Sequence, residues 1–257
     1  MAEVLKLSSP ATGDFWEIPI LYEDEHLLVL DKPPVLLTAP DPSQAERPNL
    51  LEMARQRRPG YLMNAHGLDA GAGGVTVFVK NKSSFAAVAD QFATDEPRRT
   101  YAALVRGSPV EDTFTANAKI GPHPLQMGVM RVDSREGKRS RTVFAVRERF
   151  DGYALLECRP LPDRAHQIPA HLKYLRLPLV GASLYGGQPL LLSTLKSGYR
   201  LKPGQTEHPL IAREALQAEE VMINHPITRE KLTLRAPWPK DLTVAVKYLR
   251  RYAVAPG

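Results

Sequence analysis

Short apolar runs, separated by proline, glycine and charged residues, recur along this chain. One of them, 75–79, has no polar face: Val75, Val77 and Val79 would point to one side of a strand, and Thr76 and Phe78 to the other. A strand of this kind is typical of the middle of a sheet that is covered on both sides. We therefore predict a central, fully buried strand here.

Other runs predict antiparallel hairpins and further strands. Apolar residues at 18–22 and 26–31 flank an acidic turn, and Lys32-Pro33-Pro34 ends the second run, because proline donates no hydrogen bond to a sheet. A second hairpin is predicted from residues 221–225 and 231–235. The remaining predicted strands lie at 100–105 and 153–160, with a strand pair between 111 and 149.

Three helices are predicted from capping residues and apolar spacing. Asn49 precedes an apolar stretch, and Ser83 precedes another in which apolar side chains recur at helical spacing. A third helix is predicted over 209–218. The apolar positions assigned to the core of these helices are Leu50, Leu51 and Met53, then Phe85, Val88 and Phe92, then Leu210, Ala212, Ala215 and Leu216.

The first residues of the chain show little periodicity. We predict a loose leader over 1–16 and one domain over 17–257, a length that is ample for a continuous core. The amino terminus lacks the basic segment and apolar run of a secretory signal, and no apolar run is long enough for a membrane span. A cytoplasmic protein is the expectation.

Charge and cysteine content narrow the function classes. The chain has 34 Lys and Arg against 28 Asp and Glu, which gives a formal net charge of +6. This excess is compatible with a polyanionic partner such as RNA, although many basic proteins bind no nucleic acid. Cys158 is the only cysteine, so an internal disulfide and a cysteine-rich zinc site are excluded.

The candidate chemistry lies in the loop before the central strand. His66-Gly67-Leu68-Asp69 is followed by Gly71, Gly73 and Gly74, which places one carboxylate on a flexible loop at the mouth of a buried strand. Taken alone, an aspartate in such a loop is most often a turn former or a helix cap. Its functional interpretation depends on the rest of the sequence.

These residues resemble the central motif of the RluA-like pseudouridine synthases. The family has His-Arg-Leu-Asp, then Thr-Ser-Gly, then a strand that ends in Ala-Lys, and its Asp is catalytic. Asp69 matches that residue, whereas Gly67 stands in the place of the family's arginine and Ala72 in that of its serine. The resemblance implies that Asp69 is the catalytic nucleophile.

Two later stretches carry the same resemblance. Residues 99–105, Arg-Thr-Tyr-Ala-Ala-Leu-Val, are similar to the strand that bears the family's active-site tyrosine, so Tyr101 is implied as a second catalytic residue. Residues 163–172 resemble the family's Gly-Arg-Thr-His-Gln-Ile-Arg-Val-His-Leu, but Pro169 replaces the arginine that pairs with the catalytic Asp. Proline is tolerated in the first turn of a helix, so we expect the fold to survive this change.

The resemblance runs from about residue 18 to 242 and implies both fold and activity. The implied fold is α+β, with a mixed, largely antiparallel sheet, flanking helices and a central RNA-binding cleft. The leader over 1–16 is too short to hold the small RNA-binding domain that often precedes the catalytic domain in this family, so we expect no separate N-terminal RNA-binding domain. The implied activity is isomerisation of uridine to pseudouridine in ribosomal or transfer RNA, with no cofactor and no metal. The implied RNA-binding residues are Lys32, His66, Arg99, Arg164, His166 and Gln167.

Two other interpretations stay open at this point. Because Gly67 and Pro169 replace arginines of the family's active site, the chain could be an RNA-binding relative with impaired catalysis. A phosphate-binding enzyme that uses 71–74 as an anion cradle is the other, but no Lys-Ser/Thr follows these glycines. His166 and His171 suggest a metal site only weakly, because no carboxylate cluster accompanies them.

Overall fold

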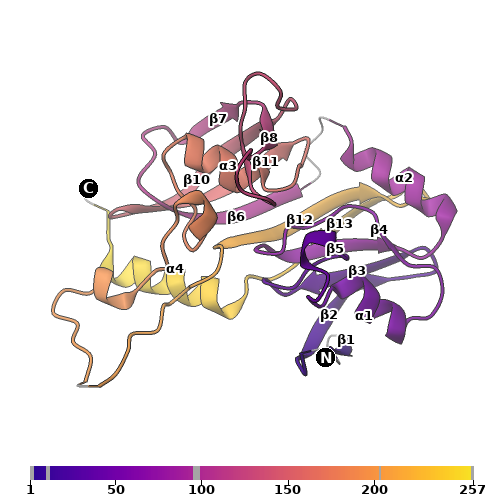
Figure 1. The fold of residues 1–257 in the computed structure, drawn as a ribbon, viewed down its shortest axis with the longest axis horizontal. Coiled ribbons are helices and arrows are strands. Elements are labelled where there is room, and N and C mark those ends of the chain that lie inside the picture. Colours follow the sequence, from indigo (N-terminus) through magenta and orange to yellow (C-terminus); the bar gives the residue numbers. More distant parts are fainter. Residues whose placement is uncertain (1–2, 10–11, 95–98, 203, 256–257) are drawn as a thin grey trace. The chain divides into compact units, whose positions relative to one another are not determined.

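The structure is a computed structural model that describes residues 3–9, 12–94, 99–202 and 204–255 (Figure 1). The chain divides into two compact units and passes between them several times. Unit 1 comprises Met1–Thr100, Leu161–Ala165 and Ala218–Pro237, and unit 2 comprises Tyr101–Pro160, His166–Gln217 and Trp238–Gly257.

Unit 1 is a layer of strands with a helix on each face. Its strands follow the order β1-β2-β3-β5-β12, with β4 paired to β5 and β13 paired to β12. The bounds are β1 Val4–Ser8, β2 Phe15–Glu23, β3 Leu27–Lys32, β4 Met63–Asn64, β5 Gly73–Val79, β12 Leu216–Asn224 (from Ala218 in this unit), β13 Lys231–Arg235, η1 Pro42–Gln44, α1 Leu50–Arg57 and α2 Lys82–Phe92.

The strand β5 lies in the middle of this layer and is buried at every position, as its sequence predicts. Phe78 packs into the cluster that contains α1, whereas Val75, Val77 and Val79 pack into the cluster that contains α2. Because side chains alternate along a strand, the side chains of β5 pack into two separate hydrophobic clusters, one on each face of the sheet. The predicted hairpins β2–β3 and β12–β13 are also confirmed.

The predicted leader is wrong over Val4–Ser8. These residues form β1 and pair with β2 from Val4↔Pro19 to Ser8↔Phe15. Leu5 and Leu7 alternate with exposed residues and are buried against the core, a period of two that is short but sufficient for an edge strand. The predicted boundary between residues 16 and 17 falls inside β2, and Met1, Ala2, Pro10 and Ala11 lie outside the described residues.

The helix capped by Asn49 is confirmed, and the Asn49 side chain accepts a hydrogen bond from the Glu52 N–H. The second helix begins earlier than predicted, because Asn81 rather than Ser83 is its N-cap and accepts from the Ser84 N–H. Asparagine is as good a cap as serine, so the sequence offered two candidates two residues apart.

Unit 2 contains the strands β6-β11-β10-β7, the small hairpin β8–β9 and two helices. The pairs β6–β11, β7–β10 and β8–β9 are antiparallel. The bounds are β6 Arg99–Arg106 (from Tyr101 in this unit), β7 Thr113–Asn117, β8 Ile120–Pro122, β9 Met130–Val132, β10 Arg141–Phe150, β11 Tyr153–Leu161, α3 Gln167–Tyr174, η2 Ser183–Tyr185, η3 Leu192–Thr194 and α4 Lys240–Tyr252.

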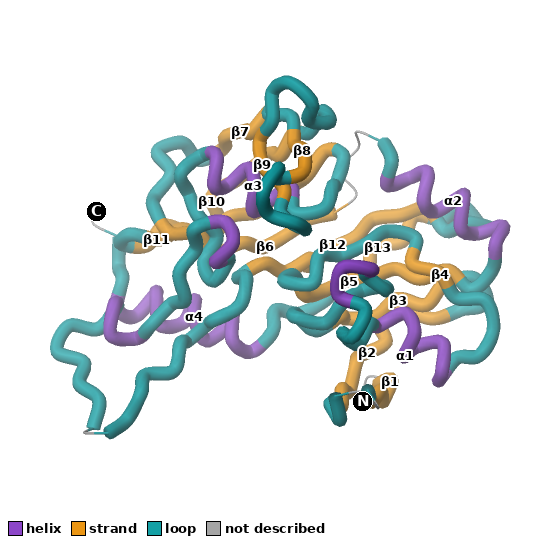
Figure 2. The backbone as a smooth tube through the Cα atoms, viewed as in Figure 1, coloured by secondary structure: helices purple, strands orange, loops and turns teal. Residues whose placement is uncertain are grey.

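The helix predicted over 209–218 is wrong. Residues 209–215 form irregular chain that leads into β12, drawn as loop in Figure 2. Their backbone groups bond to distant segments instead of to one another: Leu210 N–H donates to the Leu190 carbonyl, and Ala215 N–H to the Val180 carbonyl. Of the apolar residues that suggested a helix, Ala215 and Leu216 are buried, Leu210 is half-buried and Ala212 is exposed.

A C-terminal helix, α4, was not predicted. Leu242, Ala245, Val246 and Leu249 are buried on one face of it and pack into the core of unit 2. Their spacing of three and four residues is the usual signal of an amphipathic helix, so the sequence carried the information.

Candidate active site

Asp69 lies in the loop 65–72, which connects β4 to β5 in unit 1, and it is half-buried. The five consecutive carbonyl groups of residues 66–70 each accept a hydrogen bond. The donors are Arg99 Nη2 to residue 66 (3.3 Å), Arg99 Nη1 to residue 67 (3.1 Å), Thr38 Oγ1 to residue 68 (2.6 Å), Ala72 N–H to residue 69 (3.1 Å) and Val35 N–H to residue 70 (2.7 Å). The expectation of a flexible loop is therefore wrong: its backbone is held at every step around Asp69.

Arg99 is the residue that ties the start of this loop to the rest of unit 1. Its side chain is 0% exposed, and Nη1 also lies 3.3 Å from Asp163 Oδ2. The guanidinium carbon lies 5.1 Å from the centre of the Phe92 ring, so the cation is stacked as well as hydrogen bonded. A planar group with five N–H donors suits this position, where two carbonyls and a carboxylate converge.

His66 packs beside the same arginine. Its ring centre lies 4.7 Å from that of Phe92, and Nε2 lies 3.3 Å from the Asp163 carbonyl oxygen. Burial, together with the positive charge of Arg99, lowers the pKa of His66 to about 4. The imidazole is therefore neutral at physiological pH, and its predicted contact with RNA would not be that of a cation.

Lys32, the last residue of β3, is 0% exposed. Its ammonium donates to the carbonyls of Leu36 (2.7 Å), Pro33 (3.1 Å) and Ala70 (3.4 Å). Burial shows that Lys32 is not a surface lysine and argues against a direct contact with a phosphate. The contacts make Lys32 a support for the loop immediately after Asp69.

Gly74 shows why the loop joins β5 through a glycine. Its φ is +112°, and a Cβ atom there would lie 2.1 Å from the Ala218 carbonyl oxygen. Both the backbone conformation and the close approach of β12 require glycine. Gly67 differs, because a Cβ there would meet nothing within 4 Å.

The remaining predicted residues divide between the units. Arg164 is half-buried in unit 1. Tyr101 belongs to unit 2, where it is 3% exposed on β6 and pairs with Cys158 of β11. His166, also in unit 2, adopts a left-handed backbone (φ 52°) at the start of α3, and its ring lies 5.8 Å from that of Tyr185 in a stacked arrangement.

Gln167 is buried, and its contacts are structural. Its Nε2 donates to the Arg141 carbonyl (2.9 Å) and to Thr142 Oγ1 (3.1 Å), and the Thr142 hydroxyl is in turn 2.8 Å from His171 Nδ1. His171 Nε2 lies 2.9 Å from the Ala118 carbonyl oxygen, and burial lowers the pKa of His171. The side chains of α3 that match the family motif thus bind this helix to β10.

Pro169 is the third residue of α3 and is buried. The helix forms around it, as expected, because the N–H that proline lacks has no partner within the first turn.

Two residues in the site region were missed. Asp163 contacts both Arg99 and His66, and it stands at the start of the stretch 163–172 that the sequence already singled out. Tyr185 is 1% exposed, and its hydroxyl accepts a hydrogen bond from the Met130 N–H (3.0 Å). An aromatic residue with a polar tip, placed between two glycine-containing turns, was the available signal.

Within the described ranges, no group of three or more His, Cys, Asp or Glu side chains is arranged to hold a metal ion. None of the helices that these residues form combines the length and apolar character of a bilayer span.

Comparison with known proteins shows the family of this chain. The sequence profile of the RNA pseudouridylate synthase family matches residues 26–174, which is more than half of the chain. Ribosomal large subunit pseudouridine synthase D of Xanthomonas campestris pv. campestris is 33% identical, and the match covers 96% of this chain and 74% of that protein. Ribosomal large subunit pseudouridine synthase C of Escherichia coli (strain K12) is 32% identical, over 90% of this chain and 70% of that protein.

Solved structures agree on the fold. Human RNA Pseudouridylate Synthase Domain Containing 4 superposes with a TM-score of 0.65 at 21% identity, over 90% of this chain and 92% of that chain. Human RNA Pseudouridylate Synthase Domain Containing 1 gives a TM-score of 0.65 at 22% identity, over 93% and 97%. The predicted α+β fold with a largely antiparallel sheet is confirmed. By sequence and fold, this chain belongs to the RNA pseudouridylate synthase family.

Proposed function

We propose that this protein isomerises uridine to pseudouridine in large-subunit ribosomal RNA, with the Asp69 carboxylate as nucleophile. Membership of the family supports the reaction class, and the names of the relatives from Xanthomonas campestris and Escherichia coli support that RNA as substrate. Transfer RNA is the other substrate that the sequence left open. A cytoplasmic location stays a prediction.

The reaction needs no external reagent. The bond between N1 of uracil and C1′ of the ribose breaks, a bond between C5 and C1′ forms, the proton on C5 is lost, and N1 gains a proton. Asp69 would attack the nucleoside so that the base detaches, turns and rejoins through carbon. The Tyr101 ring would stack on the flipped-out uracil, and its hydroxyl would take part in the proton transfer.

The observation that carries this proposal is the fixed backbone around Asp69. A nucleophile must be held close to its productive position, and a displacement of about 1 Å can reduce the rate about 100-fold. Five hydrogen-bonded carbonyls in a row, two of them held by Arg99, supply that rigidity. Such support exceeds what a simple turn needs, and it favours a catalytic loop.

Charge around the loop favours an active enzyme. Arg99 places a buried guanidinium at the Gly67 carbonyl, and Lys32 places a buried ammonium at the Ala70 carbonyl. A nearby cation stabilises the ionised form of a carboxylate and opposes the effect of burial. We propose that these two cations help to keep Asp69 ionised in a chain that has Pro169 where the family has an arginine.

The proposal is tested by mapping pseudouridine in transcripts of ribosomal and transfer RNA after incubation with the protein. Asp69→Asn is expected to abolish product formation, because the amide is not a nucleophile. Asp90→Asn, at an exposed position on α2, serves as the matched control and retains the wild-type rate. Product formation by Asp69→Asn at the wild-type rate would refute the assigned nucleophile.

The second candidate is an RNA-binding relative with impaired turnover, and the observation that favours it is the pair of replacements at Gly67 and Pro169. Gly67→Arg restores the family's residue at a position with open space for a side chain. If the wild-type protein binds RNA without turnover and this variant gains turnover, the second candidate is correct. If the wild-type protein and Gly67→Arg form pseudouridine at comparable rates, the result supports the first proposal, an active enzyme.

A further inference from the structure

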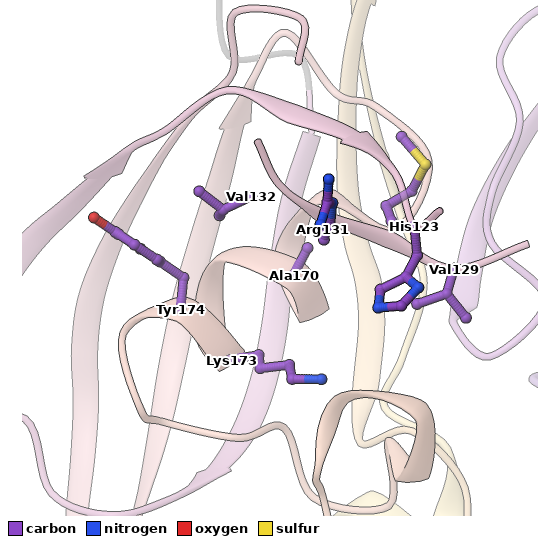
Figure 3. Close-up of a pocket in the computed structure, with 8 residues that line it drawn as sticks. His123, Val129, Arg131, Val132, Ala170, Lys173 and Tyr174 are labelled. Carbon is purple, nitrogen blue, oxygen red and sulfur yellow. The ribbon is translucent and has the colours of Figure 1, made fainter. Parts of the chain in front are cut away.

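Unit 2 contains a pocket of about 270 Å³ that the proposed reaction does not use. It lies between the β9 region and α3, and its basic and aromatic members are His123, Arg131, Lys173 and Tyr174 (Figure 3). The volume is slightly below the roughly 300–1,000 Å³ of pockets that hold drug-sized ligands. It suits a group of the size of one nucleobase rather than a large cofactor.

The walls of this pocket are fixed by the fold. On one side, β8 and β9 pair from Ile120↔Val132 to Pro122↔Met130, and the Tyr185 hydroxyl accepts from the Met130 N–H. On the other side, α3 packs against β9 and is bonded to β10 through Gln167. Hydrogen bonds and packing within unit 2 therefore hold both walls of the pocket.

Its cations are available to an anion. Lys173 and Tyr174 leave the last turn of α3 in different directions, and both are exposed, Tyr174 by 58% (Figure 3). Within the described part of the chain, no hydrogen bond or ion pair engages the Lys173 ammonium or the Tyr174 hydroxyl. Arg131 is 46% exposed and is oriented by Asp133 at 3.1 Å, and none of the described residues that line the pocket is acidic.

Apolar surface accompanies these charges. Val132 and Ala170 contribute to the lining, and Leu125 and Met127, in the loop that follows His123, are 88% and 87% exposed. Exposed apolar side chains that cluster beside a pocket are typical of a binding surface. Further exposed cations of unit 2 lie in the segment between β9 and β10 (Arg135, Lys138 and Arg139), at the start of β10 (Arg141) and after α3 (Arg176).

We propose that this pocket binds one unpaired nucleotide of the RNA substrate, outside the uridine that is modified. The base would pack on the Tyr174 ring and the apolar lining, and the phosphate would be bound by Lys173 and Arg131. Proteins recognise unpaired nucleotides by this combination of a stacking surface and cations. The inference rests on the proposed function, since it takes RNA as the ligand, and it adds a second point of contact on unit 2.

The test is a titration of a fluorescently labelled transcript of large-subunit ribosomal RNA with wild-type protein and a Lys173→Ala, Tyr174→Ala double variant. Loss of one stacked base and one phosphate contact is expected to weaken binding about 10-fold or more. The turnover assay with the same RNA should show KM raised by a similar factor and kcat unchanged. Lys247→Ala, which removes one exposed charge from α4, is the control and should stay within about 2-fold of wild type in affinity.

Three single variants separate stacking from charge. Tyr174→Phe retains the ring and is expected to bind like wild type, whereas Tyr174→Ala should weaken binding and Lys173→Ala should reduce the dependence of affinity on salt. Binding of the double variant within 2-fold of wild type would overturn the pocket proposal while leaving the proposed function intact. An equal loss of affinity in Lys247→Ala would overturn it as well. Absence of RNA binding and of turnover by the wild-type protein would overturn both.

Discussion

Arg99 and Lys32 are long cationic side chains that are fully buried, and both direct hydrogen bonds to backbone carbonyls of the Asp69 loop. A buried cation requires such partners, because its hydration is lost. Asp163 adds a carboxylate to the environment of Arg99. We infer that both cations act on the chemistry through the position and charge of the loop rather than through contact with RNA.

Replacement of Arg99 tests this positioning role. Arg99→Lys retains a charge but cannot bond two carbonyls and the Asp163 carboxylate together, so we expect kcat to fall at least about 10-fold while KM for RNA changes little. Arg99→Met leaves Asp163 without this partner and is expected to cost about 3–5 kcal/mol of unfolding free energy. Chemical denaturation and steady-state kinetics measure the two effects.

The matched control is Arg57→Lys, at an exposed position of α1 in the same unit. It should leave both stability and kinetics unchanged. A rise in KM without a fall in kcat for Arg99→Lys would instead identify Arg99 as an RNA contact.

His66 predicts how stability depends on pH. Burial first, and the nearby Arg99 second, lower the pKa of His66 to about 4 from an ordinary value of 6.5. Between these two values the unfolded chain binds a proton that the folded protein does not, so stability falls as pH decreases from about 6.5 to about 4, by up to about 3 kcal/mol. Denaturation at several pH values measures this slope.

His66→Gln should lower the slope of unfolding free energy against pH, between about pH 4 and 6.5, by the equivalent of about one bound proton. His208→Gln, at an exposed position, should leave this slope unchanged. Asp24 does not titrate between about pH 4 and 6.5, the range in which His66 acts. Burial alone would raise the pKa of Asp24, but hydrogen bonds from Tyr22, His225 and two backbone N–H groups lower it to about 2. Its contribution to stability is lost only at lower pH. An unchanged slope in His66→Gln would contradict the assignment.

At the scale of elements, β5 connects the site to both cores of unit 1. The strand begins one residue after Ala72 and is buried throughout, so the Asp69 loop ends at a central, buried strand. Gly74 permits this arrangement, because β12 passes so close that any side chain would collide with it.

Gly74→Ala is expected to destabilise unit 1 by about 3 kcal/mol or more, because it adds both a strained φ and a collision with backbone. Thermal or chemical denaturation measures the change. Gly67→Ala is the control: its Cβ meets nothing within 4 Å, so the stability should hardly change. Equal stability of the two variants would show that β5 and β12 are not packed as described.

At the scale of the whole molecule, the chain builds two compact units and carries a net charge of +6. Residues 1–100 supply most of unit 1, but Leu161–Ala165 and Ala218–Pro237 return to complete it. Asp163, which contacts Arg99, belongs to the first of these segments, Leu161–Ala165. Neither unit can therefore be assigned to a continuous stretch of the sequence.

The sequence by itself determined the family, the apolar strands, the two hairpins and the candidate nucleophile, because these depend on local pattern and on motifs of fixed spacing. It also indicated that Pro169 would be compatible with α3, since the conformational rules of proline are local. The helix that it predicted over 209–218 is wrong, because pairing with distant segments outweighs local preference there.

Only the tertiary structure decided which cations are buried and what they bind. Lys32, Arg99 and Asp163 are far apart in sequence, and the resemblance to the family implied that Lys32 and Arg99 contact RNA. Their hydrogen bonds depend on which carbonyls the fold brings within about 3 Å, and no local pattern records that. The same holds for the pocket beside Tyr174, which exists because a hairpin and a helix from separate stretches of the chain pack together.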